Sequence, residues 1–490
     1  MTKPHTLSMT ISRSLFPILA LSFGIILSSF AQDLKYIEYD TDLIPGSVNR
    51  ERRDKLMNEI GNDAVAVLYS APVRTRNADV EYQYRQDDNF LYLTGFPEPN
   101  AVLLLIPRGM QVRNPDDTTT SMTVREILFV QPRDPVREHW EGRRYGPEGA
   151  MKLRGLQYAL PIADFERTLR SVLFRSRPSV LYAPPFAGDF TGEIREILKP
   201  LQDFIDATRT RNSQTELRDP TALVYRLRRI KGPEEIALIG KISEISATAH
   251  RQAMMSCEPG MYEYELQGVY EFVYRKFGAE YNGYPCIVGA GENSVVLHYN
   301  TVRRKINDGD LVLADCGGEY HGYTTDITRT FPANGKFSRE QRQIYEIVLK
   351  AQKAAIAMMK PGTAWSDISA KASEIVEEGL FALGLVKEKN GREFRRFFTH
   401  GLGHAVGLNV HDISSPVMEA GVIYTVEPGI YIQEGTPGVD PKYFNIGVRI
   451  EDTILVTEQG PKNLSESAPR EIGEIEALMK KKGIGNVEVK

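Results

Sequence analysis

The chain has 490 residues, of which 42% are hydrophobic and 25% are charged, and its formal net charge is -4. This composition is typical of a globular protein, and the length favours two domains over one. The absence of a basic excess argues against a nucleic-acid partner or an anionic membrane surface. A P-loop, a zinc-finger spacing and a dinucleotide-binding glycine motif are also absent from the sequence. Three cysteines, an odd and sparse set, do not make a disulfide framework.

The N-terminus has the pattern of an export signal. Lys3 and Arg13 supply positive charge, residues 15–27 form an apolar run, and small residues follow at positions 29 and 31. We therefore predict a signal peptide over residues 1–31, cleaved after Ala31. The alternative is an uncleaved N-terminal anchor. After cleavage we expect an exported protein, periplasmic or secreted, with no stable membrane association.

Residues 32–225 alternate short apolar runs with helical stretches, which predicts an N-terminal α/β domain. The Asp and Thr cluster within residues 114–121 predicts a loop or hairpin tip. We assign no catalytic side chains to this domain. The predicted strands are residues 64–69, 101–106, 127–131 and 179–183.

Residues 226–490 are predicted to form a second domain that contains an internal duplication. Pro233 opens one long helix, and Ser338 opens another with a capping box. Both helices stop shortly before a Pro-Gly pair, at 259–260 and 361–362, and a new helix is predicted soon after each pair. Two similar halves are therefore expected, although chance similarity of two amphipathic helices is the alternative.

Two aspartates in this domain lie where apolar segments end or begin. Residues 311–314 are apolar and lead directly into Asp315, while Asp326 lies in a run (325–331) rich in β-forming residues. Glycines between the runs suit a turn, so two antiparallel strands would bring the carboxylates together. Carboxylates in such a setting are costly to bury unless a metal ion or an arginine neutralises them. Alone, each aspartate would be interpreted as an ion-pair or turn residue.

A glycine-rich segment contains three of the eight histidines of the chain: His400, His404 and His411. Glycines allow other groups to approach the backbone closely. Imidazoles are common metal ligands and acid-base groups, and their clustering here predicts a functional site.

Three further polar residues lie inside apolar, strand-like segments. Glu427 precedes a Pro-Gly turn, and Arg449 and Glu451 are two apart on a predicted strand, which puts both side chains on one face. A surface ion pair is the alternative for Arg449 and Glu451. The two aspartates, the two glutamates and one histidine together form a donor set that suits Mn²⁺ and also Zn²⁺, Co²⁺ or Fe²⁺. Four carboxylates would be balanced by two divalent ions, which can share a bridging hydroxide.

The ordered set of these segments resembles the pita-bread metallopeptidases and, among them, the aminopeptidase P (Xaa-Pro aminopeptidase) family. Residues 87–96 are similar to the family's N-terminal domain, and residues 229–236 are similar to its interdomain junction. The resemblance implies an α+β pita-bread fold with a pseudo-twofold duplication for the second domain. The metal ligands that it implies are Asp315, Asp326, His404, Glu427 and Glu451.

The resemblance also implies roles around these ligands. Asp326 and Glu451 would bridge two divalent ions, with Mn²⁺ as the expected metal, and Glu427 would also carry a proton to the leaving proline nitrogen. Arg449 would neutralise the charge of the ligands. The substrate-contacting positions would be His298, His400 and His411, of which His298 and His411 would assist catalysis at the scissile carbonyl.

An enzyme of this family would release the N-terminal residue from peptides with proline in second position, and we expect a homodimer or homotetramer. Prolidase, which cleaves Xaa-Pro dipeptides with the same five ligands, is the nearest alternative. It must bind the free carboxylate of a dipeptide, a task suited to arginine, and residues 412–426 contain neither Arg nor Lys. A non-catalytic peptide- or protein-binding module is a remote alternative, because such proteins typically lose the ligands. The large N-terminal domain argues against a methionine aminopeptidase.

Overall fold

A computed structural model describes residues 37–115, 117, 119–186, 191–210, 214–389 and 391–486. The predicted signal peptide, residues 1–31, lies outside these described residues. Among the helices that are described, none combines the length and apolar character needed to cross a membrane.

The N-terminal half contains a six-stranded mixed sheet. In spatial order its strands are β6 (Ala159–Pro161), β5 (Ser121–Val130), β4 (Val102–Arg113), β1 (Ala64–Tyr69), β7 (Val180–Tyr182) and β8 (Glu216–Arg218). β1 pairs antiparallel with β4 and parallel with β7. All four predicted strands are therefore present.

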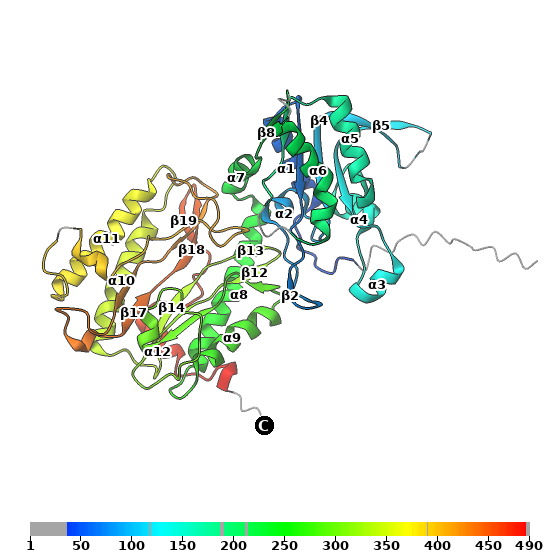
Figure 1. The fold of residues 1–490 in the computed structure, drawn as a ribbon. Helices are drawn as coiled ribbons and strands as arrows, with labels where there is room; N and C mark the ends of the chain where they lie inside the picture. Colours follow the sequence, from blue (N-terminus) through cyan, green and yellow to red (C-terminus); the bar gives the residue numbers. More distant parts are fainter. Residues whose placement is uncertain are drawn as a thin grey trace, which may run out of the picture. The chain divides into compact units, whose positions relative to one another are not determined.

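β4 and β5 form a hairpin that extends beyond the predicted segments 101–106 and 127–131 (Figure 1). The first six residues of β4 are buried, whereas the rest of the strand is partly or fully exposed. The hydrophobic pattern reveals only the buried part of the strand. The exposed part is held in the sheet by backbone hydrogen bonds between the two strands. The predicted hairpin tip at 114–121 lies where β4 ends and β5 begins.

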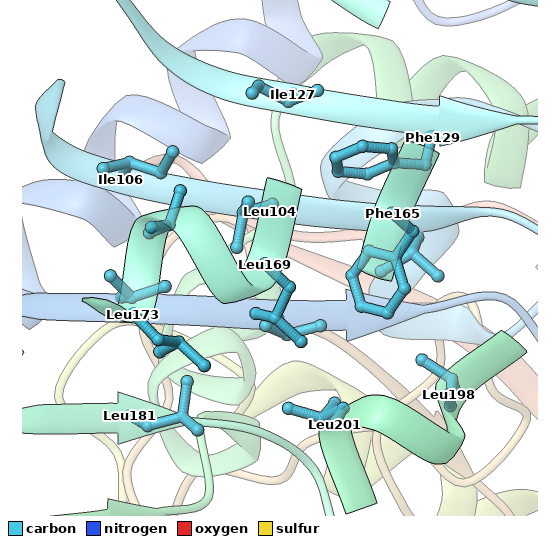
Figure 2. Packing of buried hydrophobic residues seen from close by; sticks show 14 of the residues in the cluster. Leu104, Ile106, Ile127, Phe129, Phe165, Leu169, Leu173, Leu181, Leu198 and Leu201 are labelled. Atoms are coloured by element: carbon cyan, nitrogen blue, oxygen red, sulfur yellow. The ribbon is translucent and has the colours of Figure 1, made fainter. Parts of the chain in front are cut away.

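Helices cover the sheet on both faces, which confirms the α/β prediction. On one face, α5 (Phe165–Ser176) and α6 (Glu193–Thr210) pack on the strands. Figure 2 shows Leu169 of α5 and Leu201 of α6 in the same buried cluster as Leu104 and Phe129 of the sheet. α1 (Gly46–Ile60) packs against β4 through side chains outside this cluster. Shorter elements are β2 (Thr75–Asn77), β3 (Val80–Glu81), α2 (Asp88–Thr94), α3 (Pro135–Glu141) and α4 (Gly146–Arg154).

The C-terminal half is built on two helix pairs. α8 (Pro233–Ser256) packs on α9 (Glu263–Lys276), and α10 (Arg339–Ala357) packs on α11 (Trp365–Ala382). As predicted, Pro233 is the first residue of α8, and Ser338 caps α10 reciprocally with Gln341. The junction helix α7 (Thr221–Arg229) spans the predicted boundary at residue 225, so the division into domains 32–225 and 226–490 stays a prediction.

Each helix pair is followed by antiparallel strands, so one order of elements occurs twice, in agreement with the predicted duplication. After α9 come a sheet of β10 (Ile287–Ala290), β11 (Leu311–Asp315) and β14 (Thr328–Pro332), and a sheet of β9 (Tyr281–Asn282), β12 (Gly318–Tyr320) and β13 (Tyr323–Thr324). After α11 come β15 (Ile423–Val426), β18 (Asp452–Thr457) and β19 (Gly460–Asn463) in one sheet, and β16 (Gly429–Ile432) with β17 (Ile446–Arg449) in another. The chain then forms α12 (Ile472–Leu478).

Candidate metal centre

Asp315 and Asp326 are brought together by antiparallel strands, as their spacing predicts. Asp315 is the last residue of β11 and pairs with Thr328 at the start of β14. The predicted strand over 325–331 begins only at Thr328, so Asp326 precedes it. The backbone of Asp326 bonds to a side chain in place of a neighbouring strand. The Thr453 hydroxyl accepts a hydrogen bond from the Asp326 amide (3.2 Å) and donates one to the Asp326 carbonyl (2.8 Å).

Glu427 and Glu451 lie at two breaks between strands. Glu427 directly follows β15, and Glu451 directly precedes β18. Because β15 pairs with β18 while β16 pairs with β17, the chain passes from one sheet to the other at both breaks. The predicted continuous strand through Arg449 and Glu451 is therefore wrong, since β17 ends at Arg449. Both side chains are nevertheless buried and line the same cavity.

His404 is fastened to β15 by its own backbone. Its amide donates to the Thr425 hydroxyl at 3.0 Å, and its carbonyl accepts from the Thr425 amide at 2.8 Å. The preceding residue, Gly403, needs to be small, because a Cβ there would lie 2.4 Å from the Thr425 carbonyl oxygen. The glycine pattern of this segment thus permits the close approach that orients His404.

All nine predicted site residues line one cavity of about 520 Å³. Oxygens of Asp326 and Glu451 and a ring nitrogen of His404 lie within 4.8 Å of one another. His404 Nε2 is 3.5 Å from Asp326 Oδ2 and 3.6 Å from Glu427 Oε1. The nine residues are Asp315, Asp326, His404, Glu427, Glu451, His298, His400, His411 and Arg449.

The carboxylates of this cavity destabilise one another in the metal-free protein. Burial and the charges of Asp326 and Glu427 raise the pKa of Glu451 well above its ordinary value. Burial, followed by the neighbouring Asp326, also raises the pKa of Asp315. The pKa of Glu427 rises to about 7, chiefly through burial. Crowded buried carboxylates of this kind are stabilised as anions by bound cations.

His404 compensates part of this charge. Burial disfavours its protonated form, but Asp326 and Glu427 raise its pKa to about 9. Burial raises the pKa of Asp326, but the hydrogen bond and charge of His404, together with the hydrogen bond of Tyr284, hold it below its ordinary value. Four carboxylates and one imidazole around one cavity fit divalent ions that prefer oxygen ligands with some nitrogen.

Arg449 is the other compensating cation, and it also organises the cavity wall. It is 3% exposed, and its Nη2 lies 2.7 Å from Asp315 Oδ2. It donates to the Tyr431 hydroxyl at 2.9 Å and to the Thr328 hydroxyl at 3.1 Å. Thr328 in turn donates to a Glu451 oxygen at 2.6 Å. One arginine is thus linked to two of the predicted ligands.

Three residues of the site were not predicted from the sequence. The Tyr284 hydroxyl lies 2.7 Å from Asp315 Oδ1 and also contacts Asp326. Thr328 and Tyr431 orient Glu451 and Arg449. Nothing in the local sequence distinguishes these residues from ordinary strand or loop residues, because their contacts arise only from tertiary packing.

The other three predicted histidines also lie around the carboxylates. His400 contacts the Tyr431 hydroxyl at 2.7 Å, and burial together with the positive Arg449 lowers its pKa to about 4. His411 packs edge-on against His404, with ring centroids 4.2 Å apart. Burial and the charge of His404 lower the pKa of His411. His298 lines the same cavity.

A buried ionic cluster supports the segment that carries His411. Asp412 lies 2.8 Å from an Arg228 nitrogen and 3.0 Å from Lys231 Nζ, and all three side chains are at most 3% exposed. Arg228 also donates to Asn89 at 2.6 Å. The cluster therefore links the loop behind His411 to the N-terminal half and to the start of α8.

Comparison with known proteins identifies the family. The model of metallopeptidase family M24 matches residues 237–458, and that of the aminopeptidase P N-terminal domain matches residues 49–182. The Xaa-Pro aminopeptidase of Escherichia coli is 38% identical over 449 residues, which cover 88% of this chain and 97% of that protein. The chain belongs to metallopeptidase family M24. Members of this family are metal-dependent hydrolases, which agrees with the donor set of the cavity.

Other M24 relatives and solved structures are similar over comparable lengths. Human Xaa-Pro aminopeptidase 3 is 33% identical over 445 residues, covering 87% of this chain and 84% of that protein. The structure of Pseudomonas aeruginosa aminopeptidase PepP superposes with a TM-score of 0.80 at 38% identity, covering 89% of this chain and 98% of that one. The structure of E. coli aminopeptidase P with the inhibitor Pro-Leu gives a TM-score of 0.79 at 38% identity, with the same coverage. These matches agree with the predicted pita-bread fold of the catalytic domain.

Proposed function

We propose that this protein is an Xaa-Pro aminopeptidase that uses two divalent metal ions to release the N-terminal residue from peptides with proline in second position. The observation that carries the proposal is the convergence of five metal-ligand side chains and three histidines in one cavity of an M24 chain. Two bacterial relatives, each 38% identical to this chain, are named Xaa-Pro aminopeptidase, and these names support the choice of substrate.

The ions would be held by Asp315, Asp326, His404, Glu427 and Glu451. We propose Mn²⁺ as the metal, because four of the five donors are carboxylates. Bound divalent ions supply Lewis acidity and a water nucleophile that is active at neutral pH. The protein's part is to hold the donors in place, which Arg449, Tyr284 and Thr328 do through the contacts described above.

The side chains around the ligands would act on the peptide itself. Glu427, which lines the cavity beside His404, would take up a proton and pass it to the proline nitrogen as the peptide bond breaks. His298 and His411 would donate hydrogen bonds to the carbonyl oxygen, whose negative charge grows during attack. His400, held by Tyr431, would line the part of the pocket that receives the peptide.

The charges of the cavity favour an aminopeptidase over prolidase, which stays the alternative. A dipeptide carries a free carboxylate beside the proline ring, and a prolidase needs a cation to bind it. Among the described residues that line the cavity, Arg449 is the one arginine or lysine, and Asp315 already pairs with it. A longer peptide has no carboxylate at that position and needs no such partner.

We also propose that the protein is exported and assembles as a homodimer or homotetramer. The apolar run with preceding basic residues at the N-terminus supports export. The oligomer rests on the resemblance to aminopeptidase P.

The substrate assignment is tested with the Mn²⁺-loaded protein on Xaa-Pro dipeptides and on Xaa-Pro-Pro tripeptides of the same first residue. The proposal requires that the tripeptide be hydrolysed with release of the first residue. Turnover of dipeptides alone would identify a prolidase. No hydrolysis of either, together with no bound metal, would identify a non-catalytic binding module.

A further inference from the structure

Two cysteines that play no part in the proposed reaction lie beside each other behind the metal centre. Cys286 directly precedes β10, and Cys316 directly follows β11 and the ligand Asp315. The two strands pair antiparallel with Ile287 opposite Asp315, so one further step of the register puts Cys286 opposite Cys316.

The position of this pair is one that a disulfide bond can bridge. Residues directly opposite each other in an antiparallel pair have Cα atoms about 4.5–5.5 Å apart. That separation lies inside the range of about 4.4–6.8 Å found for disulfides. The third cysteine, Cys257, is placed elsewhere: it follows α8, and its thiol lies 3.9 Å from the carbonyl oxygen of Ala333. The register therefore selects one of the three possible pairings.

The pair lies on the side of β11 that faces away from the metal ligands. Side chains alternate along a strand, so Cys316 points opposite to Asp315. Both thiols are at most 2% exposed, and their neighbours on α9 are Tyr270 and Tyr274. A bond between the two sulfurs would thus leave every predicted ligand in place.

We propose that Cys286 and Cys316 form an intramolecular disulfide when the protein matures in an oxidising environment. During folding, before the two thiols are buried, one thiolate attacks an external protein or small-molecule disulfide, and one external thiol leaves. The second cysteine then attacks the mixed disulfide. The Sγ–Sγ bond forms, both cysteines lose their protons, and the external disulfide is reduced to two thiols. The bond would link the start of β10 to the end of β11, beside Asp315. Its formation does not depend on which peptide the protein cleaves.

Peptide mapping tests the bond directly, since trypsin places each cysteine in a different peptide. The full-length protein is exported to the periplasm of a bacterial host, precipitated with acid to stop thiol exchange, alkylated in denaturant so that buried thiols react, and digested with and without prior reduction. We expect the peptides that contain Cys286 and Cys316 to be linked in the unreduced sample, with a mass two hydrogens lower than the sum of the two peptides. Cys257 should be alkylated. The peptides are residues 252–275 (Cys257), 277–303 (Cys286) and 306–329 (Cys316).

Alkylation of all three cysteines in the exported protein, or a link that includes Cys257, would overturn the proposal. So would a link between two copies of the chain in place of one within a chain. Because mapping uses the wild-type protein, it does not depend on whether a cysteine variant folds.

Thermal unfolding gives an independent measurement. The bond would close a loop of about 30 residues, so reduction should lower the thermal midpoint of the wild-type protein by about 4–6 °C. Cys286→Ala should remove this redox-dependent shift, whereas the control Cys257→Ala should keep it. Oxidised and reduced proteins should hydrolyse peptides at the same rate. Loss of most activity on oxidation would contradict the fit of the bond to the native strands.

Discussion

Binding of metal to this centre should release protons, because His404 holds one in the metal-free protein. Asp326 and Glu427 raise the pKa of His404 to about 9, so the ring is almost fully protonated at pH 7. A metal ion needs the neutral imidazole and must displace that proton. Two pH units below the pKa, the competition weakens the apparent metal affinity by about 100-fold, or about 2.7 kcal/mol.

Glu427 adds to the effect. Its pKa of about 7 means that it carries about half a proton at pH 7, so the two groups together should release about 1.5 protons. Raising the pH removes these protons beforehand. Metal affinity should therefore increase from pH 7 to pH 8, by about 10-fold through His404 alone.

Calorimetric titration of the metal-free protein with Mn²⁺, in two buffers of different ionisation enthalpy, measures the number of protons released. His404→Gln is the control, because its side chain does not titrate: it should bind Mn²⁺ more weakly and release about one proton fewer. Release of less than about half a proton at pH 7, or an affinity that does not change between pH 7 and pH 8, would show that His404 does not hold a proton in the metal-free protein.

Three substitutions test other parts of the site. Glu427→Gln should lower turnover by about 100- to 10,000-fold while the far-UV circular dichroism stays unchanged, and near-normal turnover would contradict its role. Arg449→Met should destabilise the metal-free protein by about 3–5 kcal/mol in denaturant unfolding, because it leaves Asp315 buried without its partner; a change below about 1 kcal/mol would show that Asp315 is neutralised in another way. Asp412→Asn should lower the thermal midpoint by several degrees, because buried Lys231 loses its anion and buried Arg228 is left with Asp88 at 3.5 Å, whereas Asp440→Asn on the surface should leave it unchanged. Equal midpoints for the two variants would argue against the buried cluster.

Much of the metal centre was predictable because its ligands interrupt hydrophobic segments. Asp315 ends a fully buried strand, and Glu427 lies between two others, so a carboxylate stands out against its surroundings. The histidine segment stood out through its glycines, and Gly403 is indeed required for the approach to Thr425. The local sequence pattern was sufficient to predict a ligand wherever a polar residue interrupted an apolar segment.

Other features could not be predicted because they depend on contacts between distant segments. Tyr284 and Tyr431 resemble any tyrosine near a strand, and only tertiary packing brings their hydroxyls to Asp315 and Arg449. The break before Glu451 arises because β17 and β18 belong to different sheets, which period-two reasoning cannot detect. The register that places Cys286 opposite Cys316 is likewise a property of the sheet.

The metal dependence of hydrolysis is tested most directly by following activity while metal is returned to the protein. The metal-free enzyme is titrated with Mn²⁺, and release of the first residue from an Xaa-Pro-Pro peptide is measured at each step. We expect no release without metal and a rate that reaches its plateau at two ions per chain. Hydrolysis that is independent of metal, or fully loaded protein that does not release the first residue, would contradict this expectation.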